Sequence, residues 1–175
     1  IVIPELLLDE FDAGAVVLAQ QGKPVAPMPV EAVAEIVSAL RVPFIVKGVM
    51  TAEGARKALA AGAQGIVVSN HGGRVLDETP STIEVLPDIV KAVRGKMTIL
   101  IDGGFRTGLD VFKALALGAD GVLIGRPFTY AVYGGGEEGV VAYIEKVRAE
   151  LEEAMLMTGA VSLSDIDASK VSVQS

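Results

Sequence analysis

The chain has 175 residues, 51% of them hydrophobic, and a formal net charge of −7. This length suits one well-buried domain rather than two, and the acidic balance argues against a nucleic-acid partner, which would require clustered Lys and Arg. No apolar run approaches the ~18 residues of a membrane span. Because cysteine is absent, disulfides and thiolate metal sites are excluded; no metal site is expected, and a cytoplasmic location fits.

Short apolar segments alternate with helical patterns along the chain. The expected strands are residues 6–8, 43–48, 65–69, 97–101 and 121–124. The expected helices are residues 13–22, 30–40, 51–61, 81–93, 107–117 and about 138–157. Capping signals open three of these helices, at Thr51, Ser81 and Thr107. From Ser162 the chain becomes polar, so we expect residues 1–161 to form the folded unit and 162–175 a loosely held tail.

An internal repeat bears on the fold class. Residues 45–66 align without a gap on residues 101–122, at an offset of 56 positions. Apolar strands alternating with helices indicate a parallel sheet, and equal βαβ units favour a (β/α)8 TIM barrel over a doubly wound α/β sheet. A full barrel takes about 200–250 residues. We therefore expect this chain to supply about strands 4–8 plus the C-terminal helix, with open sheet edges that favour a homo-oligomer.

The expected strand 65–69 runs into a polar turn that carries the only histidine, His71. Ligands bind at the carboxyl ends of strands in α/β barrels. Gly72 and Gly73 allow backbone to approach a ligand closely, and Arg74 is a permanent donor suited to a carboxylate or phosphate. Imidazole exchanges protons near neutral pH. We interpret His71 as a catalytic proton acceptor, against the alternative of an ordinary loop histidine, and Arg74 as the partner of a substrate anion.

Lys47 lies in an otherwise apolar strand, which is costly unless its ammonium meets an anion or an electron-rich ligand. The alternative is a lysine that extends from the barrel rim into solvent. Asp102-Gly103-Gly104-x-Arg106 and Gly125-Arg126 follow two successive strands, directly before helix starts. Backbone amides and helix dipoles at such places form phosphate sites. We expect Asp102 to contact a ribose or ribityl hydroxyl rather than the phosphate.

These segments resemble the FMN-dependent α-hydroxy acid oxidase and dehydrogenase family, which includes glycolate oxidase, lactate oxidase and flavocytochrome-type lactate dehydrogenases. The resemblance extends from about Val30 to Ile166. The segments that carry it are Val46-Lys47-Gly48, Ser69-Asn-His-Gly-Gly-Arg74, Asp102-Gly-Gly-x-Arg106 and Lys113-Ala-Leu-Ala-Leu-Gly-Ala-x-x-Val-x-Ile-Gly-Arg-Pro127.

The resemblance implies a role for each site residue. The residues implied to hold FMN are Lys47, Ser69, Asp102, Gly103, Gly104, Arg106, Gly125 and Arg126. Lys47 would stabilise the reduced, anionic isoalloxazine, His71 would remove the hydroxyl or α-carbon proton of the substrate, and Arg74 would bind its carboxylate. The family pairs its histidine with an aspartate at the end of strand four. Asp9 is the candidate here, with Asp12 as the alternative.

The implied reaction is the oxidation of an L-2-hydroxy acid of the lactate and glycolate class to the 2-keto acid. The electron acceptor is left open among oxygen, a quinone and a cytochrome. Two alternatives remain at this stage. One is another FMN barrel, such as an isopentenyl diphosphate isomerase-like enzyme; the other is an inactive half-barrel fragment that serves as an assembly module.

Overall fold

The structure, a computed structural model, describes residues 29–74 and 76–172. The strands within these residues are β1 (Ile45–Val49), β2 (Gly65–Val68), β3 (Thr98–Ile101) and β4 (Gly121–Val122). The α-helices are α1 (Val30–Ala39), α2 (Ala52–Ala60), α3 (Thr82–Val93), α4 (Gly108–Ala116) and α5 (Arg126–Thr158). Three 3-10 turns complete them: η3 (His71–Gly73), η4 (Leu163–Asp165) and η5 (Ala168–Lys170). The expected strand 6–8 and helix 13–22 lie outside the described residues.

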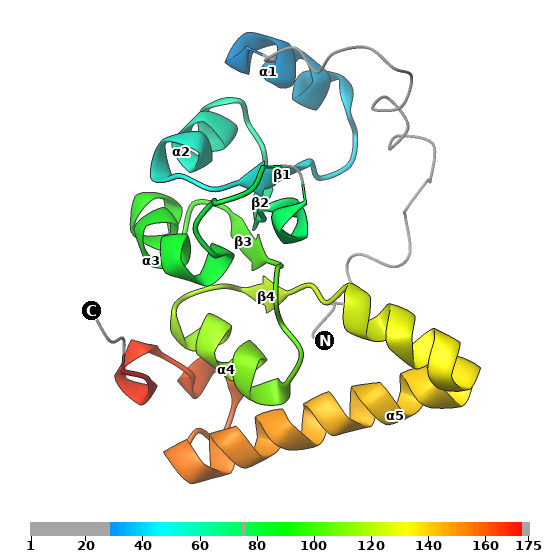
Figure 1. Ribbon diagram of the computed structural model, residues 1–175. Helices are drawn as coiled ribbons and strands as arrows, with labels where there is room; N and C mark the ends of the chain where they lie inside the picture. The colour runs from blue at the N-terminus through cyan, green and yellow to red at the C-terminus, as the bar shows by residue number, and fades with distance from the viewer. Residues whose placement is uncertain (1–28, 75, 173–175) are drawn as a thin grey trace.

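The strands form one parallel sheet in the order β1-β2-β3-β4 (Figure 1). Each strand pairs with the next one along the chain, and the two expected βαβ repeats become β1–α2–β2 and β3–α4–β4. A doubly wound sheet reverses its strand order at a switch point, whereas a TIM barrel adds its strands consecutively. The order therefore confirms the expected barrel architecture, of which this sheet is a part.

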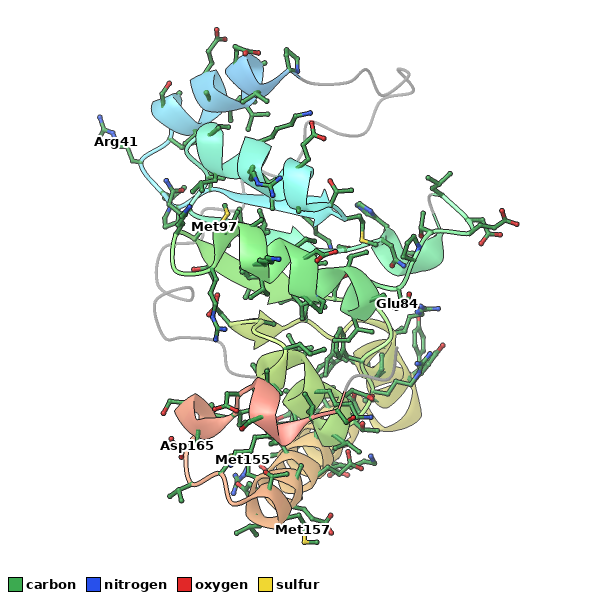
Figure 2. All side chains as sticks on the ribbon, turned by 90° about the vertical axis from the view of Figure 1, so that its left-hand side faces the viewer. Arg41, Glu84, Met97, Met155, Met157 and Asp165 are labelled. Carbon is green, nitrogen blue, oxygen red and sulfur yellow. The ribbon has the colours of Figure 1, made fainter. Side chains whose placement is uncertain are left out.

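Helices α2, α3 and α4 cover one side of the sheet, which faces the viewer in Figure 2. Every residue of β2 is buried, and α3 turns Leu86, Ile89 and Val93 into the same apolar core. β2 is apolar throughout, whereas β3 begins with the exposed Thr98 and continues with three apolar residues. This rigid layer fixes the carboxyl ends of the strands, where the polar side chains gather.

The capping signals place the starts of the helices as expected. The Thr51 hydroxyl accepts a hydrogen bond from the Gly54 amide at 3.0 Å at the start of α2. The Thr107 hydroxyl accepts from the Asp110 amide at 3.1 Å at the start of α4. Ser81 and Glu84 form the expected capping box of α3. Such caps satisfy amides that have no partner inside the helix.

The last helix differs from the expectation of about 138–157. It begins at Arg126, and Pro127 fits its first turn because a proline there forfeits no intrahelical hydrogen bond. Of the three consecutive glycines 134–136, only Gly136 leaves the helical conformation, with a φ of 57°. The result is two helical segments joined by a kink. No helix in the described ranges is both long and apolar enough to cross a membrane.

The C-terminal segment also differs from the expectation of a loosely held tail. As far as residue 172, it packs against α4 and α5, with Ile166 buried beside Phe112 and Leu151. The Asp165 carboxylate accepts a hydrogen bond from the Ser162 amide at 2.7 Å, which closes the turn η4 (Figure 2). Lys170 Nζ donates to the Thr158 carbonyl at 3.0 Å. The polar composition of this segment suggested a loose tail, but the segment is held by the buried Ile166 and by the capping hydrogen bonds of its turns.

Candidate active site

The expected site residues that the structure describes meet at the carboxyl side of the sheet. Lys47 lies on β1, and the others follow β2, β3 and β4. They enclose a cleft of about 270 Å³. Its lining comprises Lys47, His71, Gly72, Arg74, Asp102, Gly103, Gly104, Phe105, Arg106, Leu123, Gly125, Arg126, Pro127 and Tyr130. One strand and the segments that follow the other three strands thus contribute to one space, as in the ligand sites of α/β barrels.

A hydrogen-bonded cluster of Lys47, Ser69 and Asp102 joins the first three strands. Lys47 Nζ donates to Ser69 Oγ at 2.9 Å and forms an ion pair with Asp102 Oδ2. Ser69 is buried, whereas the Lys47 side chain is 46% exposed toward the cleft. Asp102 Oδ1 is buried without a hydrogen-bond partner among the described residues. A buried carboxylate oxygen of this kind calls for a donor such as a ligand hydroxyl.

The turn that carries His71 has an unusual backbone. His71 itself has a φ of 55°, and Gly72 and Gly73 continue with φ of 71° and 72°. A non-glycine residue in the left-handed region is strained and persists only where its surroundings enforce it. Here the His71 amide donates to Ser69 Oγ at 3.2 Å, and the Gly72 amide donates to Asn70 Oδ1 at 3.1 Å. These bonds hold the turn against the end of β2 and fix the backbone position of His71.

The imidazole of His71 is exposed to the cleft. Neither ring nitrogen has a hydrogen-bond partner among the residues the structure describes. The predicted aspartate partners, Asp9 and Asp12, lie outside those residues. An accessible ring with free nitrogens is the geometry that a proton acceptor needs.

Two arginines converge beside the histidine turn. Arg126 Nη2 and Arg74 Nε lie 3.3 Å and 3.8 Å from the point where a Cβ on Gly72 would be. Arg74 Nε also donates to the His71 carbonyl at 3.2 Å. No carboxylate within the described ranges lies within 4.0 Å of either guanidinium. Two neighbouring cations without a protein counter-ion attract an anion.

The expected phosphate loops are open where a phosphate would approach. A Cβ added to Gly104 or Gly125 would meet no atom within 4 Å. Arg106 Nη1 donates to the Gly104 carbonyl at 2.9 Å, which places its guanidinium beside the same loop. Open backbone next to arginines at a helix start fits an anionic group, since the N-terminal end of α5 is electropositive.

Two contributors were missed by sequence reasoning. Thr82, the first residue of α3, is buried, and its hydroxyl donates to the Asp102 carbonyl at 2.6 Å. Thr82 directly follows Ser81 of the capping box, and the capping box accounted for the polar residues there, so no contact between Thr82 and Asp102 was expected. Tyr130 lines the cleft from the first segment of α5. It was missed because that helix was expected to begin twelve residues later than Arg126.

Comparisons with known proteins agree with this geometry. Residues 10–173 match a family model described as FMN-dependent dehydrogenase. The chain is 51% identical over 129 residues to peroxisomal (S)-2-hydroxyacid oxidase GLO3 of Arabidopsis thaliana, covering 74% of this chain and 36% of that protein. It is 52% identical over 124 residues to the L-lactate dehydrogenase of Pectobacterium atrosepticum, covering 71% of this chain and 32% of that protein.

Solved structures give the same result. A mandelate oxidase with 3,3-difluoro-2-hydroxy-3-phenylpropionic acid superposes with a TM-score of 0.77 at 44% identity, covering 82% of this chain and 43% of that one. A second mandelate oxidase structure, a mutant with a C4a-OH-FMN adduct, has a TM-score of 0.77 at 45% identity, covering 81% and 43%. The chain spans about a third of the length of the curated relatives it matches.

Proposed function

The chain belongs to the FMN-dependent dehydrogenase family, and we propose that it forms the cofactor- and substrate-binding part of an enzyme that oxidises an L-2-hydroxy acid to the 2-keto acid. The observation that carries the proposal is the convergence of Lys47, His71 and Arg74 on one cleft. The names of similar proteins support a hydroxy-acid substrate: 2-hydroxyacid oxidase, glycolate oxidase, L-lactate dehydrogenase and mandelate oxidase. We place the substrate in the lactate and glycolate class.

The residues present fit FMN. The unpartnered Asp102 Oδ1 is an acceptor suited to a ribityl hydroxyl. The open turns at Gly104 and Gly125, with Arg106 and Arg126 beside them, suit the phosphate. Lys47 and Ser69 would then hold the polar edge of the ring system. When bound, FMN supplies a two-electron acceptor for the oxidation.

Arg74 and His71 divide the work on the substrate. Arg74 binds the carboxylate through its guanidinium, which matches a carboxylate with two parallel hydrogen bonds. His71 receives the proton that leaves the substrate as its two electrons are removed. That proton comes from the hydroxyl oxygen or from the α-carbon, and both routes use the same two residues. The hydrogen bond from Arg74 Nε to the His71 carbonyl keeps the anion partner and the base in one unit.

The test is the visible spectrum of the purified protein supplied with FMN, recorded before and after anaerobic addition of L-lactate, glycolate or (S)-mandelate. We expect flavin bands that bleach with at least one L-2-hydroxy acid and persist with D-lactate. A protein that is colourless after incubation with FMN and removal of the unbound FMN would overturn cofactor binding by this chain. Bound flavin that none of these acids reduces would overturn the hydroxy-acid substrate and favour another FMN barrel reaction.

A further inference from the structure

The strand β1 contains a bulge at Gly48. In its ladder with β2, Lys47 pairs with Val67 and Val49 pairs with Val68, so Gly48 has no counterpart. Its φ is +99°, a conformation that residues with a side chain rarely adopt. Bulges are uncommon between parallel strands, and near active sites they serve to redirect side chains. The irregularity therefore calls for a local reason.

The imidazole of His71 lies directly against this glycine. A Cβ added to Gly48 would lie 2.9 Å from His71 Cε1, closer than real Cβ atoms approach. The same point is 3.8 Å from Nδ1 and 3.9 Å from Nε2. The ring thus presents its Cε1 edge to Gly48, with its two nitrogens at nearly equal distances on either side.

We infer that Gly48 is a positioning residue that seats the His71 imidazole for proton transfer, an inference that rests on the proposed function. No hydrogen bond from the described residues reaches either ring nitrogen, so within this part of the chain the orientation of the ring rests on packing contacts, and the contact with Gly48 is one of them. A seat at Cε1 holds the ring while leaving both nitrogens free. One can face the substrate and the other a carboxylate partner.

A side chain at position 48 would displace the ring. To restore an ordinary contact of at least 3.4 Å from 2.9 Å, the imidazole or the strand must move by about half an ångström. Catalytic groups must be held to about 0.5 Å, and misplacement by about 1 Å costs up to 100-fold in rate. The bulge and the glycine thus act together: the bulge brings the backbone close to the His71 ring, and the absence of a side chain on Gly48 leaves space for the ring.

The first test needs no variant. His71 is the only histidine in the chain, so a protein purified without a histidine tag gives one imidazole Cε1–Hε1 signal in a carbon–proton NMR spectrum. We expect a nuclear Overhauser effect between that Hε1 and the α-protons of Gly48. Its absence would overturn the inference, while bleaching of bound flavin by a hydroxy acid would still support the proposed function.

The second test compares Gly48→Ala with Gly62→Ala. Gly62 has a similar φ of +87°, but a Cβ there would meet only Val37 Cγ1, at 3.4 Å. Both variants place a Cβ on a residue with a φ near +90°, and only the Cβ of Gly48→Ala meets the imidazole. We expect Gly48→Ala to shift the His71 signal and lower the rate of flavin reduction by about 10- to 100-fold at saturating substrate, with FMN still bound. Equal effects of the two variants would overturn the inference.

Discussion

The two βαβ units of the sheet share a backbone plan, and they differ in the residues at the ends of their strands. Positions 56 apart repeat the same left-handed glycines: Gly48 and Gly104 have φ of 99° and 89°, and Gly62 and Gly118 have φ of 87° and 99°. The helix of each unit is capped by a threonine. The backbone of the second unit therefore reproduces that of the first at its turns.

The chemistry at the strand ends has diverged. Where the first unit ends in Ser69-Asn70 and leads to the histidine, the second has Gly125-Arg126 at the equivalent positions. The space over Gly48 is filled by an imidazole, whereas the space over Gly104 is open. In the proposed function, the first unit therefore presents the proton acceptor and the second unit the phosphate site. Repetition supplies the scaffold, and substitutions at the strand ends assign the two tasks.

Replacing His71 with glutamine should remove the proton acceptor that the first unit contributes. Glutamine keeps polar atoms in the cleft but cannot accept the proton. We expect the rate of flavin reduction to fall by about 100- to 10,000-fold, or roughly 3–5 kcal/mol in activation free energy. The measurement is anaerobic stopped-flow absorbance with the proposed substrate, with FMN affinity determined in parallel and expected to be unchanged.

Arg126→Gln is the matched control from the second unit. It should weaken FMN binding, because one charge-assisted hydrogen bond is lost, while the reduction rate of the FMN that remains bound stays within a few-fold. If both variants impair FMN binding and reduction equally, the two units do not divide the tasks as described.

The sequence predicted the parts of this molecule that depend on local rules. Alternating apolar strands and helices, three capping signals and the 56-residue repeat indicated a parallel sheet of barrel type. The sequence also predicted which residues from Lys47 to Arg126 line the cleft, because they lie in or directly after strands, and parallel strands bring their carboxyl ends to one edge.

Features set by distant contacts could not be predicted in this way. The bulge at Gly48 lies against the ring of His71, a residue 23 positions later. The task of Thr82 depends on a carbonyl twenty positions away. The start of α5 was missed as well, because the segment from Arg126 to the kink at Gly136 is helical although it contains Gly134 and Gly135.

A second difference between the units lies at the first residue of each helix, which is Ala52 in α2 and Gly108 in α4. A Cβ on Gly108 would lie 2.2 Å from the Leu151 amide nitrogen and 2.3 Å from the Val147 carbonyl oxygen. Because both are backbone atoms of α5, the two helices would have to separate. We expect Gly108→Ala to lower the free energy of unfolding by about 3 kcal/mol, measured by urea denaturation.

Gly134→Ala is the control for that variant. Gly134 is also helical, but a Cβ there would meet nothing within 4 Å. This substitution should leave stability unchanged or raise it by up to about 1 kcal/mol, since alanine favours the helix. Equal destabilisation by both variants would show that close packing of α4 on α5 is not the reason for the glycine.

Thr82 links the two units, and removing its hydroxyl should have the smallest effect. Its Oγ1 donates to the carbonyl of Asp102, and together with Asn70 it surrounds Gly103. Thr82→Val keeps the shape but leaves a buried carbonyl unpaired, so we expect a loss of about 1–2 kcal/mol in urea denaturation and weaker FMN binding. Thr82→Ser retains the donor and should preserve FMN affinity. If valine and serine weaken FMN binding equally, the Thr82 hydroxyl does not hold Asp102 in the position that FMN binding requires.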